Sequence, residues 1–201
     1  MKIYLARHGQ SRWQVERGEA DWNSPLSTLG HEQGRLLGRW LNNGAQLNND
    51  ELVKIKAIYA SPLERAHETA VYTANNLNLP ITTIDPLAEA EFLISPHLPS
   101  AHSPGQAPIN STLSDEYLTF KAQAQTALDR LVAEADAQGG PILAFAHGGL
   151  ISTLFRIVAD SDTVSFWIYN TSLNLIEWKR GRWHFIHLNL LDHLPPELRT
   201  Y

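Results

Sequence analysis

The chain has 201 residues, 43% of them hydrophobic and 18% charged, which fits one folded domain with a sizeable apolar core rather than a disordered chain. Its 16 basic and 21 acidic residues give a net charge of −5, so it lacks the basic surface typical of proteins that bind nucleic acid or anionic membranes. The absence of cysteine excludes disulfides, thiolate metal ligands and cysteine nucleophiles. The apolar run before Arg7 is too short for a signal peptide or a membrane span, and we expect a cytoplasmic protein.

Three short apolar runs predict buried strands at residues 2–6, 55–60 and 142–146. Each run is followed by small or polar residues and then by apolar positions at helical spacing. Strands that alternate with helices favour a parallel sheet that is covered on both faces. We therefore expect an α/β fold: a single domain over residues 1–201, built as a three-layer sandwich with a mostly parallel central sheet and helices on both faces.

Capping residues indicate where the first two helices begin. Ser27 or Thr28 is expected to cap the helix that follows the first strand. Residues 61–64, Ser-Pro-Leu-Glu, have the pattern of a capping box with Pro62 at the first helical position. The second helix is therefore predicted to begin within this tetrapeptide.

The second half of the chain has one long helix, one short helix and a closing hairpin. The long helix is predicted from about residue 114 to residue 137, with Leu118 and Ala122 on its apolar face. The short helix is predicted over residues 150–158, and the two hairpin strands over 173–178 and 183–188.

Residues from about 93 to 116 interrupt the alternation of strands and helices. Four of the 11 prolines and several serines lie between residues 95 and 114. A loop of this length inside a compact domain is usually functional, so we expect a lid-like insertion close to the site.

Charged residues fall where predicted strands end. Arg7 and His8 follow the first strand, Arg65 lies on the first turn after the second, and His147 follows the third. Ligands of open α/β sheets bind outside the carboxyl ends of the strands, so we expect these side chains to converge. Two guanidinium groups, two imidazoles and adjacent glycines suit a dianion with several oxygens. The pattern predicts a site for a phosphoryl group.

Five segments in this order resemble the histidine phosphatases, the superfamily that includes the cofactor-dependent phosphoglycerate mutases. The resemblance extends from residue 3 to about residue 158. No single segment is specific, but five in the same order are a strong signal. The segments are Arg7-His8-Gly9-Gln10-Ser11 with Trp13, then residues 25–30 (PLSTLG), residues 61–70 (SPLERAHETA), residues 87–92 (LAEAEF) and residues 146–149 (AHGG).

The resemblance implies a phosphatase that acts on a small phosphomonoester. His8 would be the nucleophile and form a phosphohistidine, and Glu89 would protonate the leaving oxygen and later activate water. Arg7, Arg65 and His147 would bind the phosphoryl oxygens. No cofactor and no metal are expected, because arginines occupy the electrostatic role that a metal plays in other enzymes.

The chain departs from the family pattern in places near the substrate. Gln14 stands where the family usually has Asn; we keep it as an expected phosphate ligand, although its side chain is one methylene longer. Glu91 is an alternative to Glu89, since residues two apart share a face in an extended segment. The continuation usual after the acidic segment is replaced by residues 93–97, Leu-Ile-Ser-Pro-His.

Several residues also have structural interpretations. Arg65 could pair with a glutamate of its own helix. Arg156 is expected to be an ion-pair or surface residue rather than a ligand. The six tryptophans are interpreted as core residues rather than a binding platform. Surface or core positions are also expected for the other histidines, including His31, His184, His187 and His193.

Three other functions remain open. A mutase would return the phosphoryl group to substrate, and it would need cations that residues 93–116 do not supply. A metallohydrolase could use His8, His147 and Glu89 as ligands, but Arg7 would repel a divalent cation. A non-catalytic phosphate-binding module is the third alternative. The sequence does not decide whether the chain forms a homodimer, and it does not name the substrate.

Overall fold

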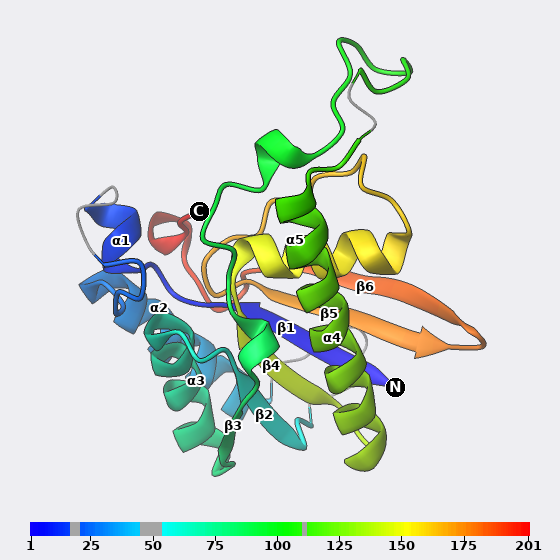
Figure 1. Ribbon diagram of the computed structural model, residues 1–201. Helices are drawn as coiled ribbons and strands as arrows, with labels where there is room; N and C mark the ends of the chain where they lie inside the picture. The colour runs from blue at the N-terminus through cyan, green and yellow to red at the C-terminus, as the bar shows by residue number, and fades with distance from the viewer. Residues whose placement is uncertain (17–20, 45–53, 110–111) are drawn as a thin grey trace.

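The computed structural model describes residues 1–16, 21–44, 54–109 and 112–201, and it has one six-stranded sheet at its centre (Figure 1). The strands are β1 (Lys2–Arg7), β2 (Ala57–Ala60), β3 (Ile81–Thr83), β4 (Ile142–Ala146), β5 (Leu173–Lys179) and β6 (Arg182–Leu190). Their order across the sheet is β3-β2-β4-β1-β5-β6. The first four strands in this order are parallel, whereas β5 is antiparallel to β1 and β6 to β5. The mostly parallel sheet predicted from the sequence is confirmed.

Helices cover both faces of this sheet and complete the expected sandwich. Helices α2 and α3 pack on one face, and α4 and α5 pack on the other. The helices are α1 (Arg12–Val15), α2 (Thr28–Asn42), α3 (Glu64–Leu77), α4 (Asp115–Ala137) and α5 (Gly148–Ala159), with short 3₁₀ turns at Asp85–Leu87, Ser95–His97 and Pro196–Leu198.

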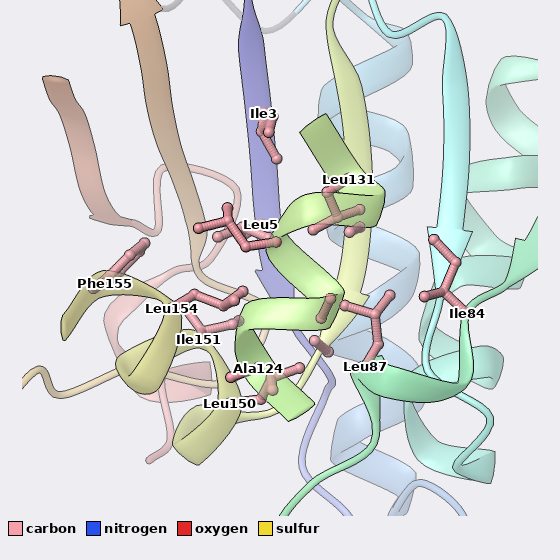
Figure 2. Close-up of a cluster of buried hydrophobic side chains, with 14 of the residues drawn as sticks. Ile3, Leu5, Ile84, Leu87, Ala124, Leu131, Leu150, Ile151, Leu154 and Phe155 are labelled. Carbon is pink, nitrogen blue, oxygen red and sulfur yellow. The ribbon is translucent and has the colours of Figure 1, made fainter. Parts of the chain in front are cut away.

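The central strands are apolar throughout because both of their faces are buried. In β1, Ile3 and Leu5 face helices α4 and α5, while Tyr4 and Ala6 face α2 and α3. The same alternation is found in β4. Figure 2 shows the core on the α4 and α5 side, where Ala124, Leu131, Leu150, Ile151 and Leu154 gather over β1.

The closing hairpin also agrees with the sequence. Strands β5 and β6 pair across Arg180 and Gly181, which both have positive φ, at 54° and 76°. This combination matches a two-residue turn with both central residues in the left-handed region, which suits the twist of the two strands.

The capping box predicted at residues 61–64 is wrong. Helix α3 begins at Glu64, and its cap residue Leu63 makes no side-chain hydrogen bond. The Ser61 hydroxyl accepts from the Leu63 amide at 3.2 Å and contacts His147 instead. Ser61 and Pro62 therefore lie before the helix, in the turn that leads from β2 to α3.

The predicted apolar face of the long helix is wrong in its first turns. Leu118 and Ala122 are exposed, and Tyr117, Phe120 and Ala124 are buried in their place. Two aromatic rings thus supply the buried area that aliphatic spacing assigned to Leu118 and Ala122. Among the described residues, no helix is long and apolar enough to span a membrane.

Candidate active site

The two histidines follow neighbouring strands, and this topology brings them together. Strands β1 and β4 are paired in parallel, with Arg7 opposite Ala146. The His8 amide donates to the Ala146 carbonyl at 3.0 Å, and the imidazole rings of His8 and His147 have centroids 5.1 Å apart. Only 4% of the His8 surface and none of the His147 surface is exposed. The carboxyl ends of the strands thus converge as expected.

Arg65 extends from the first turn of α3 to the same place. Its Nε lies 3.3 Å from Nε2 of His8, and its Nη1 donates to the Trp22 carbonyl at 2.7 Å. The guanidinium lies 5.1 Å from the centre of the Trp22 ring and is nearly buried. Burial lowers the pKa of Arg65 to about 10, so the side chain is cationic at neutral pH. It forms no ion pair with a glutamate of its own helix within the described residues.

Arg7 is held in place at the end of β1 by two contacts. Its Nη1 donates to the Ile168 carbonyl, and its guanidinium lies 5.1 Å from the centre of the Tyr201 ring. Hydrogen bonds from Gln33 and Asn170 to residues 198–200 hold that segment beside the end of β1. Each active-site arginine is therefore covered by an aromatic ring, Arg65 by Trp22 and Arg7 by Tyr201.

The hydrogen bonds of His8 assign its ring proton. Nδ1 lies 2.6 Å from the Gly9 carbonyl, which can only accept, so Nδ1 carries the hydrogen and Nε2 keeps its lone pair. Burial, followed by the charges of His147, Arg7 and Arg65, holds the pKa of His8 well below its usual value. The ring is therefore neutral at physiological pH and has an unprotonated nitrogen on the side of Arg65.

Ser61, which the sequence suggested as a helix cap and not as a site residue, orients His147. Nε2 of His147 lies 2.8 Å from the Ser61 hydroxyl. That oxygen also accepts from the Leu63 amide, and in the tautomer in which its own hydrogen goes to Nε2 the ring proton lies on Nδ1. Burial and the two arginines hold the pKa of His147 well below its usual value. The signal in the sequence was the position of Ser61, directly after a buried strand.

Glu89 completes the cluster, and Glu91 does not belong to it. The Glu89 carboxylate accepts from the Gly149 amide at 2.8 Å and from the Ala90 amide at 3.1 Å, whereas Glu91 is exposed. Burial raises the pKa of Glu89, although both amides and Arg7 and Arg65 oppose the shift. A carboxyl group in this position holds its proton to a higher pH than an exposed one.

Glycines in the site are required by close packing. A Cβ on Gly149 would lie 2.6 Å from the Glu89 carboxylate and 2.6 Å from Ile94. A Cβ on Gly9 would lie 2.5 Å from the Gly30 carbonyl, so Gly9 allows two backbone segments to meet rather than a ligand to approach. A glycine at position 149 therefore lets its backbone amide and the Glu89 carboxylate lie side by side at the start of α5.

Two buried nitrogens of the cluster lack a hydrogen-bond partner in the part of the chain that the structure describes. They are Nε of Arg7 and Nδ1 of His147. Buried donors are nearly always paired, so unpaired ones are informative. Both belong to the residues expected to bind phosphoryl oxygens.

The sequence profile of the histidine phosphatase superfamily (branch 1) matches residues 3–191. The chain belongs to this superfamily. Over 202 aligned residues it is 26% identical to the Bacillus subtilis protein named "Uncharacterized phosphatase PhoE", with 96% of both chains covered. Its fold is similar to that of Bacillus stearothermophilus YhfR (TM-score 0.72, 24% identity, 96% of this chain and 98% of that one). It is also similar to that of a phosphoserine phosphatase from Entamoeba histolytica (TM-score 0.70, 20% identity, 96% and 99% covered).

This cluster of residues opens into a cleft of about 810 Å³. Arg7, Glu89, Gly148 and Gly149 line its phosphoryl end, by which we mean the end next to the two histidines. Most side chains of the remaining wall are apolar or aromatic. They include Trp13, Trp22, Phe92, Leu93, Ile94, Pro96, Leu98, Phe166 and Tyr201.

This wall corrects two interpretations of the sequence. Trp13 and Trp22 pack edge to face and line the cleft, whereas Trp40 and Trp183 pack against the core as expected. Arg156 is not a surface residue, and it forms no ion pair with another described residue: it is 2% exposed and also lines the cleft. The other histidines agree with their interpretation, and His193 is a buried one that contacts Thr171.

Gln14 lines the cleft, but its amide is engaged by the protein. Its Oε1 accepts from the Ser11 amide at 3.0 Å, and its Nε2 lies 3.2 Å from Oδ1 of Asn170. Asn170 in turn donates to the His8 carbonyl at 3.0 Å. Gln14 thus supports the backbone of His8, and its role as a phosphate ligand stays a prediction. No spacing or motif in the sequence indicated Asn170.

Proposed function

We propose that this superfamily member is a phosphomonoester hydrolase that transfers the phosphoryl group of a small metabolite to His8 and then to water. The observation that carries the proposal is the neutral His8 ring, whose Nδ1 is tied to the Gly9 carbonyl while Nε2 lies beside Arg65. A nucleophile at phosphorus needs an unprotonated lone pair and positive charge around the oxygens.

In the first half-reaction, Nε2 of His8 would form a bond to phosphorus as the bond to the leaving oxygen breaks. Arg7, Arg65 and Nδ1 of His147 would hold the three non-bridging oxygens. Glu89, which burial keeps protonated to a higher pH than usual, would give its proton to the leaving alcohol. The Gly9 carbonyl would stabilise the positive charge that the ring acquires on phosphorylation.

In the second half-reaction, water would attack phosphorus and the bond to Nε2 would break. Glu89, now ionised, would accept the proton of the attacking water. The products are inorganic phosphate and the neutral His8 ring. The proton that Glu89 lost to the alcohol is thus recovered, and the cycle is balanced.

Hydrolysis is favoured over phosphoryl return by the charge of the cleft. Apart from Arg7, the only lysine or arginine among the described residues that line it is Arg156. A mutase that returns the phosphoryl group to a phosphorylated acid must hold a second phosphoryl group as well as the carboxylate, and one further arginine does not supply the charge for both. The guanidinium groups also occupy the positions from which a metal would act, so we propose a metal-independent reaction.

Phosphate release from phenyl phosphate tests this proposal. We expect turnover that survives a chelator and is inhibited by vanadate, whose trigonal-bipyramidal form resembles the transition state. Phosphoryl transfer to an added alcohol that exceeds hydrolysis would favour the mutase alternative. Loss of turnover in chelator would favour a metallohydrolase, and binding without turnover a non-catalytic module.

A further inference from the structure

A buried arginine lies in the cleft beyond the phosphoryl end. Gly149, Ser152 and Arg156 all line the cleft and follow one another on α5 at i, i+3 and i+7, so they share one face of the helix. A helix rises 1.5 Å per residue, which places the Cα of Arg156 about 10 Å along the axis from that of Gly149. This helix face therefore runs from the Glu89 contact to Arg156.

The guanidinium of Arg156 is held in a fixed orientation. Its Nη2 donates to the Thr153 hydroxyl at 2.8 Å, and its Nε donates to the Tyr117 hydroxyl at 2.9 Å. Thr153 is one turn nearer the phosphoryl end, and its own hydroxyl donates to the Gly149 carbonyl at 2.9 Å. The side chain is therefore folded back along the helix, as helical side chains tend to be. Nη1 donates to no residue of the described ranges.

No carboxylate in the part of the chain that the structure describes pairs with Arg156. The Tyr117 hydroxyl donates a hydrogen bond to the Asp162 carboxylate at 2.9 Å, but Asp162 forms an ion pair with Lys121 at 2.6 Å. Lys121, Asp162 and Arg156 together therefore keep one positive charge. The carboxylates that line the cleft are Glu89, which belongs to the phosphoryl end, and the exposed Glu91. A buried cation is stabilised when a bound anion supplies the missing partner.

We propose that Arg156 binds a carboxylate on the leaving group, so that the favoured substrates are monophosphates of ring-sized, largely apolar alcohols or phenols that carry one carboxylate. The phosphoryl group lies at the start of α5, the apolar body lies against Phe92, Ile94 and Phe166, and the carboxylate meets the free Nη1. This inference rests on the proposed phosphatase function and adds the chemical class of its substrate.

The test compares 4-carboxyphenyl phosphate with 4-carbamoylphenyl phosphate, which has nearly the same shape and no charge, and repeats the comparison with the 3-substituted pair. The ratio of kcat/KM within a pair is measured for the wild type and for Arg156→Gln, so that differences in leaving-group reactivity cancel. We expect the carboxylate-to-amide ratio of at least one pair to fall about tenfold or more in Arg156→Gln, because a hydrogen bond to a charged group is lost.

Two further variants make the result specific. Arg130→Gln removes an exposed arginine that pairs with Glu134 on α4, and it should leave both ratios unchanged. Thr153→Val removes the acceptor that holds Nη2 and should lower the ratio by about threefold, and it serves as the main test where Arg156→Gln does not fold.

The outcomes separate this inference from the proposed function. Ratios that are the same in wild type, Arg156→Gln and Thr153→Val would overturn the role of Arg156, while hydrolysis of phenyl phosphate continued. If the wild type released no phosphate from any of the five esters, the phosphatase proposal itself would fail.

Discussion

The two ends of the cleft are built in different ways. At the phosphoryl end, His8, Arg65 and His147 lie directly after strands or on the first turn of a helix, and each is nearly buried. At the other end, much of the wall comes from residues 91–98, which connect elements and include Leu93 with 75% of its surface exposed. Regular elements fix the groups expected to perform chemistry, while an irregular segment forms much of the wall around the space that we propose for the leaving group.

This difference has a physical basis. Parallel strands must end at the same edge of the sheet, so residues at their carboxyl ends converge whatever the loops do. A connecting segment packs on the surface and can change without disturbing the core. The phosphoryl end should therefore respond to substitution in the same way for all substrates, and the other end in a way that depends on the leaving group.

The largest effect we predict is at Glu89, which lies where the two ends of the cleft meet. Glu89→Gln should lower kcat/KM for phenyl phosphate by about 10² to 10⁴, the usual contribution of a general acid, and should affect 4-nitrophenyl phosphate much less because nitrophenolate leaves without a proton. Since burial raises the pKa of Glu89, kcat/KM for phenyl phosphate should fall only as pH rises beyond the usual carboxyl range, and the variant should lack this decline.

The matched control for that prediction is Glu91→Gln, two residues along and exposed. Its kcat/KM should stay within about threefold of wild type, as for most exposed positions. A larger loss in Glu91→Gln than in Glu89→Gln would mean that the acid has been assigned to the wrong carboxylate.

Arg65→Lys, unlike Glu89→Gln, should lower kcat/KM by the same factor whatever the leaving group. Lysine keeps the charge but cannot donate to Trp22 and lie beside His8 together, so kcat/KM should fall by about 10² to 10³ for every phosphomonoester alike. Steady-state rates with phenyl and 4-nitrophenyl phosphate measure this, with the exposed Arg39→Lys as control. A loss that varied with the leaving group would contradict the assignment of Arg65 to the phosphoryl end alone.

Gly149→Ala should disturb the point where the two ends meet. The new Cβ would lie 2.6 Å from both the Glu89 carboxylate and Ile94, so one of them must move. We expect kcat/KM for phenyl phosphate to fall about tenfold, a moderate fraction of what a general acid contributes. The melting temperature is the control for unfolding: it should not fall greatly, because alanine has a higher helix propensity than glycine. Normal activity with phenyl phosphate would show that Glu89 is not held by this contact.

The smallest effect is expected at the wall formed by residues 91–98. Leu93→Ser removes apolar surface that a leaving group would cover, so KM for phenyl phosphate should rise about threefold to tenfold while kcat changes little. The control is Leu118→Ser, at an exposed leucine that lies on α4 rather than in the cleft wall, and its KM should stay unchanged. An equal loss of kcat would assign Leu93 to the chemical step.

The phosphoryl end was the more predictable part from sequence. His8, His147 and Arg65 could be placed because strands and helix starts have periodic, short-range signals, and the sheet then brings them together. Their positions agree with the expectation, and Glu89 rather than Glu91 is the carboxylate that accepts from the Gly149 amide and interacts electrostatically with Arg65. The roles that we assign to them remain to be tested by the experiments above.

Features that depend on side-chain packing could not be predicted. Ser61 was interpreted as a helix cap, because the motif does not reveal that a further turn precedes α3. Arg156 was expected to be an ion-pair or surface residue, because its partner Tyr117 becomes a neighbour only when α4 packs on α5. Asn170 contacts His8 from a segment 162 residues away, and no local pattern encodes that distance.

Trapping the enzyme-bound phosphate tests the central claim most directly. Glu89→Gln is mixed with 4-nitrophenyl phosphate, quenched in base and digested, and the phosphorylated atom is identified. We predict acid-labile, base-stable phosphate on Nε2 of His8, since the Gly9 carbonyl occupies Nδ1, and none in His8→Ala. The exposed His67→Ala should be labelled like its parent. Phosphate on Nδ1 or on another residue, or turnover by His8→Ala, would contradict the account.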